Sequence, residues 1–153
     1  MVSSGTDRLL LKRRRLWHVP RLVDIYRDPR TLTQGGGSSS LPTAYRRLSL
    51  GCLGRRHWSI FVAGARRPIG SVGFWRWSDG RPELVYWIHP DHWGAEMATG
   101  AITRALSRRR RRPVVSLSRT ANLGSCLVLE ELGFVAESNL RRYGTEQRLY
   151  VLD

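Results

Sequence analysis

The sequence predicts an α/β or α+β domain built around one mixed sheet. Residues 57–90 hold three strand-like segments separated by short turns, which is typical of antiparallel strands that follow one another in a sheet. Segments with helical spacing alternate with further strand-like segments on both sides of this block. Hydrophobic residues make up 41% of the 153 residues, so a chain of one domain's length can bury a core.

The N-terminal part predicts a strand and two helices. In "TDRLLLKRRRLW", Leu9 and Leu11 alternate with charged neighbours, as in a half-buried strand. "HVPRLVDIYRDPRTL" has apolar residues near helical spacing and is predicted to be a helix that ends at Pro29. "TQGGGSSSLP" (33–42) is predicted to be a flexible loop, and "TAYRRLSLGCLGR" (43–55) a helix weakened by its glycines. Residues 1–5 are expected to form a flexible tail, and residues 6–153 a single domain.

The rest of the chain alternates strands and helices. "HWSIFVAG", "IGSVGFWRW" and "ELVYWIHP" are predicted strands, and "SDGRP" is a hairpin turn between the second and the third. A helix over about 94–110 leads to the strand "PVVSLSR". The helix in "ANLGSCLVLEELGF" can turn Leu127, Leu129 and Leu132 toward a core and is closed by Gly133. The strand "QRLYVL" comes last.

The sequence carries no signal for a membrane span, for secretion or for a metal site. No stretch reaches the roughly 20 apolar residues that a membrane span needs, and "MVSSGTDR" lacks the apolar segment of a secretory signal. We therefore expect a cytoplasmic protein. Cys52 and Cys126 stand alone, without partners at metal-ligand spacing, so we expect buried, reduced thiols and no metal.

The chain is strongly basic, with a formal net charge of +14. Of its 26 Lys and Arg residues only Lys12 is a lysine. An anionic partner would explain this composition, because arginine binds phosphate and carboxylate through two hydrogen bonds. The codons of a GC-rich genome would explain it equally well. The run Arg108–Arg112 has two corresponding interpretations. It binds ribosomal RNA or an acidic substrate, or it is the solvated end of a helix.

Five segments follow one another in an order that resembles a known family. They are "TDRLLLKR", "DIYRDP", "IGSVGF", "YWIHPDHWG" followed by "EMATGAI", and "N..S..VLEELGF". The set resembles the GNAT superfamily of acetyl-CoA-dependent N-acetyltransferases, and specifically its branch of ribosomal-protein N-terminal acetyltransferases (RimJ/RimL-like). The resemblance runs from about residue 6 to the C-terminus. It implies a mostly antiparallel, twisted sheet flanked by helices, acetyl-CoA as the cofactor, and direct transfer of acetyl to a primary amine of a protein N-terminus or a small molecule.

The stretch "HPDHWGAEMATGA" (89–101) joins a predicted strand to a predicted helix, whose N-terminal N–H groups can hold a pyrophosphate. In the family this turn reads Gln/Arg-x-x-Gly-x-Gly/Ala, and Glu96 stands where the family has its central glycine. A glutamate that turns inward would repel the pyrophosphate, whereas one that points to solvent would leave binding weakened but present. The resemblance implies that acetyl-CoA is bound by Trp87, Ile88, His89, Trp93, Gly94, Ala95, Glu96, Met97, Ala98, Thr99 and Asn122.

The resemblance also implies two catalytic residues. Glu83 begins the strand before the turn, where several relatives have a general base, and Ser125 stands where the ribosomal-protein branch has a candidate proton donor to the leaving thiolate. Each has a structural alternative, as a solvent-exposed residue beside a hairpin turn and as a helix-surface serine. Asn122 also suits a helix N-cap, and for His89 a structural role in the turn is favoured.

Two further questions stay open at the level of sequence. Trp75 and Trp77 share one face of their strand and either line an acceptor groove or pack at the edge of the core. The alternative function is that of a catalytically inactive GNAT-like module that binds nucleic acid or a ribosomal partner through its arginines, which Glu96 and the net charge favour. Such a module would bind RNA with steep salt dependence and would not bind acetyl-CoA.

Overall fold

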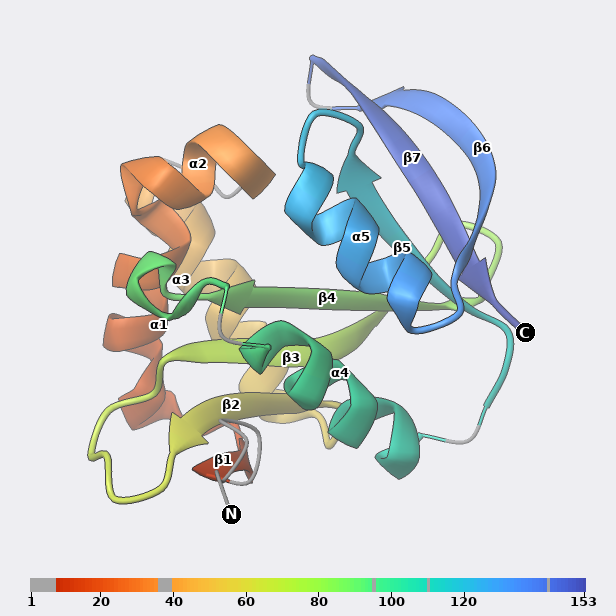
Figure 1. The fold of residues 1–153 in the computed structure, drawn as a ribbon. Helices are drawn as coiled ribbons and strands as arrows, with labels where there is room; N and C mark the ends of the chain where they lie inside the picture. Colours follow the sequence, from red (N-terminus) through yellow and green to blue (C-terminus); the bar gives the residue numbers. More distant parts are fainter. Residues whose placement is uncertain (1–7, 36–39, 95, 110, 143) are drawn as a thin grey trace.

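The computed structural model describes residues 8–35, 40–94, 96–109, 111–142 and 144–153. In these residues seven strands form one sheet with helices on both faces (Figure 1). The strands are β1 (Leu9–Arg13), β2 (His57–Val62), β3 (Gly70–Arg76), β4 (Pro82–Ile88), β5 (Val114–Arg119), β6 (Val135–Arg142) and β7 (Thr145–Leu152). The helices are α1 (Val19–Arg27), α2 (Pro29–Gly35), α3 (Leu41–Leu50), α4 (Met97–Arg108) and α5 (Leu123–Glu131), with the 3-10 turns η2 (Leu16–His18), η3 (Gly51–Leu53) and η4 (Pro90–His92).

The sheet has the strand order β1-β2-β3-β4-β5-β7-β6. All neighbouring strands are antiparallel except β4 and β5, which are parallel. The antiparallel pairs follow from short connections, whereas the parallel pair needs the long crossover through α4. The predicted α/β (α+β) class, with a mixed and mostly antiparallel sheet flanked by helices, is confirmed.

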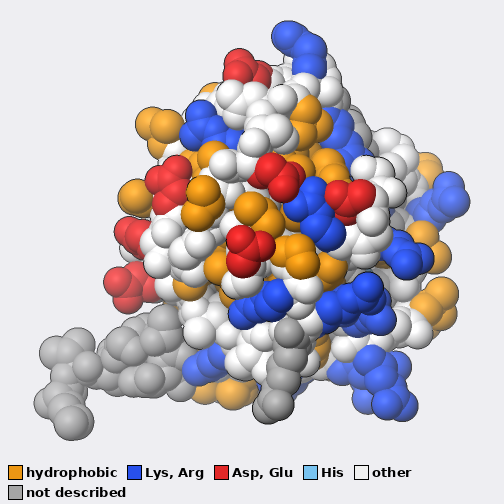
Figure 2. Space-filling model, turned by 90° about the vertical axis from the view of Figure 1, so that its right-hand side faces the viewer, with side chains coloured by type: hydrophobic (Ala, Val, Ile, Leu, Met, Phe, Trp, Pro, Cys, Tyr) orange, Lys and Arg blue, Asp and Glu red, His pale blue; other side chains and the backbone are white. Residues whose placement is uncertain are grey.

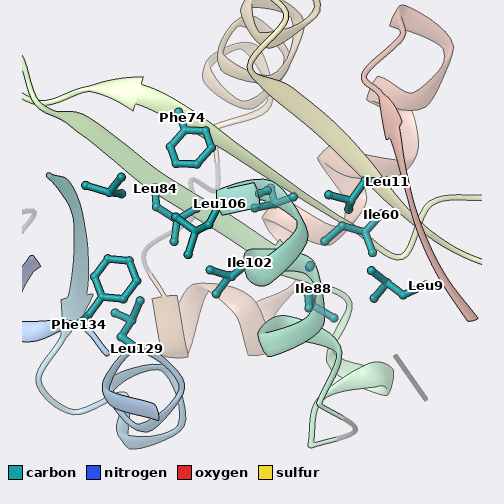
Figure 3. Close-up of a cluster of buried hydrophobic side chains, with 14 of the residues drawn as sticks. Leu9, Leu11, Ile60, Phe74, Leu84, Ile88, Ile102, Leu106, Leu129 and Phe134 are labelled. Atoms are coloured by element: carbon teal, nitrogen blue, oxygen red, sulfur yellow. The ribbon is translucent and has the colours of Figure 1, made fainter. Parts of the chain in front are cut away.

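The two faces of the sheet carry different helices and two apolar clusters. On one face α4 and α5 pack over the larger cluster, in which Ile102 and Leu129 lie among side chains of β1 to β5 (Figure 3). On the other face α1 and α3 form the second cluster, against which Trp87 of β4 packs. Strand β4 contributes to both, because alternate side chains of a strand point to opposite faces. None of the helices in the described part of the chain combines the length and the apolar character that crossing a membrane requires.

Pro29 begins a second helix instead of only ending the first, which corrects the loop predicted over residues 33–42 at both ends. Thr33 to Gly35 belong to α2, and Leu41 and Pro42 begin α3; residues 36–39 lie outside the described residues. Proline suits the first turn of a helix, where its missing N–H would have no intrahelical partner. The Asp28 side chain accepts a hydrogen bond from the Arg30 backbone N–H (2.9 Å) and so caps α2. The helix predicted over 43–55 ends at Leu50, and that over 94–110 begins only at Met97.

Strand β6 was not predicted. Its sequence "VAESNLRR" has almost no apolar alternation, and most of its residues are exposed, because it is an edge strand paired only with β7. In α5, Leu129 is buried and Leu132 packs on the core, but Leu127 is 56% exposed, so the prediction for Leu127 was wrong. Both cysteines are free thiols as expected, although only Cys126 is buried and Cys52 is half-buried.

Gly70 explains why the strand "IGSVGF" carries glycine at its start. A Cβ at this position would lie against the carbonyl oxygen of Trp87 and the Cα of Ile88 in β4. We expect Gly70→Ala to lower the free energy of unfolding by about 1–3 kcal/mol, because β3 and β4 would have to separate. Urea unfolding measures this. Gly54→Ala is the matched control, because its Cβ would make only an ordinary contact, 4.0 Å from the Arg56 backbone nitrogen, and equal stability of the two variants would contradict the expectation.

Candidate active site

Strands β4 and β5 separate soon after they meet. In this parallel pair the matched residues are Glu83 with Val115 and Leu84 with Ser116, and no further pair follows in the described residues. Leu84 directs its backbone groups toward β5, since its carbonyl accepts a hydrogen bond from Ser116 Oγ (3.0 Å). By alternation, the backbone N–H and C=O groups of Tyr86 and Ile88 also point toward β5, into the opening between the two strands.

A pair of hydroxyl groups lies on the α5 side of this opening. Tyr86 Oη and Ser125 Oγ are 2.7 Å apart, which joins β4 to α5 by a hydrogen bond in which either atom can be the donor. Burial raises the pKa of Tyr86 to about 12, and the hydrogen bond to Ser125 opposes this rise. Tyr86 therefore keeps its proton at neutral pH. Asn122 caps α5, because its Oδ1 accepts a hydrogen bond from the Ser125 N–H (3.1 Å), as its N-cap interpretation predicted.

Glu83 lies on the opposite face of β4, opposite Trp75 of β3 in the β3–β4 ladder. It is half-buried and not solvent-exposed. Burial raises the pKa of its carboxyl group, while the guanidinium groups of Arg142 and Arg47 lower it. A carboxylate with a raised pKa in a partly dry site is suited to accept a proton from a substrate amine. A groove of about 320 Å³ opens beside it, and Trp77 forms part of its wall.

The turn after β4 is held by its own side chains. His89 Nδ1 accepts a hydrogen bond from the Asp91 N–H (3.1 Å) and caps η4, which agrees with a structural role for His89. Arg30 at the start of α2 pairs with both Asp28 (3.1 Å) and Asp91 (3.0 Å), so it ties this turn to α2. The indole N–H of Trp93 donates to the Ile88 carbonyl (2.8 Å) at the wide end of the opening.

Glu96 is the N-cap residue of α4, with a left-handed backbone at φ 60° and ψ 13°. It is the only non-glycine residue with positive φ in the part of the chain that the structure describes. A left-handed backbone favours glycine, so the backbone at this position suits a glycine although the residue here is glutamate. The Glu96 side chain is exposed, and the first N–H groups of α4, from Met97, Ala98 and Thr99, follow it directly. Ala95 lies outside the described residues.

We expect Glu96→Gly to raise the free energy of unfolding by about 0.5–1 kcal/mol. The variant removes the strain of a left-handed side-chain-bearing residue, about 1–2 kcal/mol, and part of this gain is offset by the greater freedom of glycine in the unfolded chain. Thermal or urea unfolding measures the change. As a control, Leu127→Gly, at an exposed site inside α5, should destabilise by about 1 kcal/mol. If Glu96→Gly also destabilises, the left-handed geometry at this position is contradicted.

A second groove, of about 360 Å³, runs beside the N-terminal half of α4. Its lining includes Glu96, Thr99 and Gly100 of this region, Arg104 one turn later, and Glu131 at the end of α5. The groove starts at the helix N-terminus, where an anion is favoured, but two carboxylates and a single guanidinium line it. An anion at this end of the site would therefore be held by the backbone more than by side chains.

The structure brings most of the predicted site residues to one place, with Glu83 and Ser125 on opposite sides of β4. Of the two predicted strand residues, Ile88 directs its backbone groups into the opening. The Trp87 ring lies on the other face of β4 and packs edge-on against Tyr26, with ring centroids 4.8 Å apart. Sequence reasoning missed the hydroxyl group of Tyr86 as the partner of Ser125. The alternation of Leu84, Tyr86 and Ile88 along the strand was the available signal, since it puts Tyr86 on the side that faces α5.

The described residues of the run Arg108–Arg112 divide into two groups. Arg108 stacks over Trp58, 5.6 Å from its ring centroid, and Arg109 over Phe74, at 5.2 Å. Arg109 is half-buried, whereas Arg108, Arg111 and Arg112 are exposed. The run is thus only partly a solvated helix end. Figure 2 shows the side of the molecule near the end of α4, where most charged side chains in the lower half are Lys or Arg.

Solved structures of other proteins share this fold. A putative GNAT-family acetyltransferase from Bordetella pertussis is similar, with a TM-score of 0.79, 22% identity and 95% of each chain covered. The putative acetyltransferase yncA from Salmonella typhimurium, solved with its cofactor acetyl-CoA, has a TM-score of 0.77 and 15% identity, over 94% of this chain and 92% of that one. RimL, a ribosomal alpha-N-protein acetyltransferase, has a TM-score of 0.75 and 17% identity, over 99% and 92%. At these identities the likeness shows the fold alone.

The sequence itself shows the family. A search of curated proteins finds no match. A sequence profile described as the acetyltransferase (GNAT) domain matches residues 8–135, which is more than half of the chain. The resemblance deduced from the motifs is thereby confirmed, and the chain belongs to the GNAT acetyltransferase family.

Proposed function

We propose that the protein is an acetyl-CoA-dependent N-acetyltransferase that acts on a primary amine by direct attack. The observation that carries this proposal is the opening between β4 and β5, with a half-buried carboxylate on one face of β4 and a hydrogen-bonded hydroxyl pair on the other. Acetyl-CoA supplies a thioester whose acyl carbon the amine attacks. The family assignment and the acetyl-CoA named for the Salmonella protein support this cosubstrate.

Each group of residues around the opening would have a separate role in the reaction. The backbone groups of Tyr86 and Ile88 that face β5 would hold the amide-bearing arm of the cosubstrate, and the N–H groups at the start of α4 would hold its pyrophosphate. Glu83 would take a proton from the acceptor ammonium or amine. Ser125 would pass a proton to the departing thiolate while it takes one from Tyr86 Oη, which then regains a proton from water.

An acetyl-transfer assay tests this function. Purified protein is mixed with acetyl-CoA and a panel of peptides with free N-termini and small primary amines, and release of the CoA thiol is followed. Acetylated product, identified by its mass, in amounts that match the thiol released, supports the proposal. Thiol release at the same rate without any acceptor, and no acetylated amine from any member of the panel, would contradict it.

A second candidate function is binding of a polyanion at the basic end of α4. Burial, and next the neighbouring charges of Arg56 and Arg111, lower the pKa of the Arg109 guanidinium, so Arg56 and Arg111 each lie close enough to Arg109 to repel it. Such a cluster favours an anionic partner such as RNA. If this is the main function, RNA affinity falls steeply with salt and acetyl-CoA does not bind. The cytoplasmic location stays a prediction.

A further inference from the structure

The groove beside Glu83 is formed by segments far apart in the sequence. Arg76 and Trp77 come from the end of β3, Glu83 from β4, and Arg141 and Arg142 from the end of β6. The β3–β4 turn passes behind β6 and β7 in Figure 1, which brings these segments together. The volume of about 320 Å³ is enough for an amine and the groups next to it, at the lower end of small-ligand sites.

Positively charged side chains outnumber carboxylates in the lining of this groove. Arg76, Arg141 and Arg142 line it, and Glu83 is the one carboxylate in its described lining. The acidic residues of the neighbouring hairpins are engaged elsewhere: Arg81 pairs with Asp79 at 2.8 Å, and through both terminal nitrogens with Glu137, at 2.9 and 3.0 Å. These two carboxylates are therefore largely neutralised by Arg81 and do not offset the groove arginines.

Arg76 and Arg142 are better placed than Arg141 to bind an anion in the groove. Arg141 is exposed to solvent, which screens its charge. Arg142 lies over the Trp77 ring, 5.2 Å from its centroid, and is close enough to Glu83 to lower the pKa of its carboxyl group. The guanidinium group of Arg142 is thus held between the aromatic wall and the candidate base.

We propose that this groove selects an acceptor whose primary amine is followed closely by an anionic group, a carboxylate or a phosphate. Arg76 and Arg142 would bind the anionic group while the amine reaches Glu83, since guanidinium groups pair with both anions through two hydrogen bonds. This inference rests on the proposed function, because it names the substrate class of the same site.

The arginines act on the amine as well. A cationic ammonium group that has no anionic neighbour is disfavoured beside two guanidinium groups. The same repulsion works against polycationic acceptors such as polyamines. The groove arginines therefore favour an amine with an anionic neighbour over an acceptor that carries only positive charge.

Two matched acceptor series test the inference. The peptide series has the N-termini Ser-Asp-Glu, Ser-Asn-Gln and Ser-Lys-Lys, all amidated at the C-terminus, and the small-molecule pair is O-phosphoethanolamine and ethanolamine. Each acceptor is measured for KM in acetyl transfer and, independently, for binding by calorimetry in the presence of CoA. We expect the acidic member of a series to have a KM at least about tenfold lower than its neutral counterpart, a difference that shrinks as salt is added. Which series shows the preference distinguishes a peptide carboxylate from a phosphate.

Variants then assign the preference to the groove. Arg76→Gln and Arg142→Gln should each raise the ratio of KM for the acidic acceptor to KM for the neutral one about tenfold, a ratio in which any change at Glu83 common to both acceptors cancels. Arg66→Gln, between β2 and β3 and exposed, is the control and should change neither. Because Arg142 packs on Trp77, unfolding curves check its folding, and Arg76→Gln gives a second, independent test.

Failure of the inference differs from failure of the proposed function. Transfer to acidic and neutral acceptors with equal KM, unaffected by both variants, would overturn the inference and leave the acetyltransferase standing. Binding of the acidic acceptor that depends on Arg142, without any acetyl transfer, would support the anion site and contradict the proposed transferase.

Discussion

Glu83→Gln should lower kcat by roughly 100-fold or more, because general acid–base catalysis contributes about 10²–10⁴-fold to a typical enzyme rate. The amide keeps the size of the side chain but cannot accept a proton from the amine. Glu83 lies half-buried at the point where β4 and β5 separate, so no bulk water replaces it easily. Steady-state acetyl transfer with the best acceptor of the panel measures the loss. Glu146→Gln, at an exposed site on β7, is the matched control and should retain full activity.

The pH profile distinguishes a base from a packing residue. Because burial raises the pKa of the Glu83 carboxyl, activity of the natural protein should increase with pH as this group loses its proton, at a higher pH than for an ordinary glutamate. The Gln variant should lack this limb. An unchanged profile in the variant would mean that Glu83 is not the base.

The stability of the Glu83→Gln variant gives a second check on the role of Glu83. A carboxyl whose pKa is raised in the folded state favours folding while it is protonated, and this contribution is lost as the pH rises through the folded-state pKa. At neutral pH, Glu83→Gln should therefore be at least as stable as the natural protein. Lost activity in a protein that unfolds no more readily then points to chemistry and not to misfolding.

Ser125→Ala should lower kcat by roughly 100-fold, at the lower end of general-acid contributions, because a thiolate is a comparatively good leaving group. Tyr86→Phe should show a smaller loss of the same kind, since it removes only the partner 2.7 Å from Ser125 Oγ. Both effects should appear in kcat more than in KM, because the proton is needed only as the thiolate leaves.

The two variants should not be additive. If Tyr86 acts through Ser125, the double variant should be about as slow as Ser125→Ala alone. Ser107→Ala, near the end of α4, is the control for a serine outside the opening. Full activity of Ser125→Ala would show that the thiolate takes its proton from water.

The larger part of the fold was predictable from the sequence because most strands carry an apolar pattern. The short apolar runs in "LLLK" and "ELVYWI" mark strands that bury one or both faces. Strand β6 has no such pattern, because its pairing with β7 depends on backbone hydrogen bonds and not on buried side chains. Helix α2 was missed because a proline that ends one helix is also favoured in the first turn of the next, and Pro29 begins α2.

The candidate site was less predictable than the fold. The motif around residues 89–101 located the helix N-terminus, but the left-handed backbone of Glu96 is a tertiary outcome that residue type argued against. The hydrogen bond between Tyr86 and Ser125, 39 residues apart, depends on how α5 lies over β4. The groove arginines come from two hairpins whose contact no local pattern encodes.

The central claim is that the opening between β4 and β5 and the start of α4 bind acetyl-CoA although Glu96 replaces glycine. Calorimetric titration of acetyl-CoA into the natural protein and into Glu96→Gly tests it most directly. The natural protein should bind one equivalent, and the Gly variant should bind about three- to tenfold more tightly, because one exposed like charge near the pyrophosphate is removed. Absence of binding to both proteins, each shown to be folded, would contradict the account.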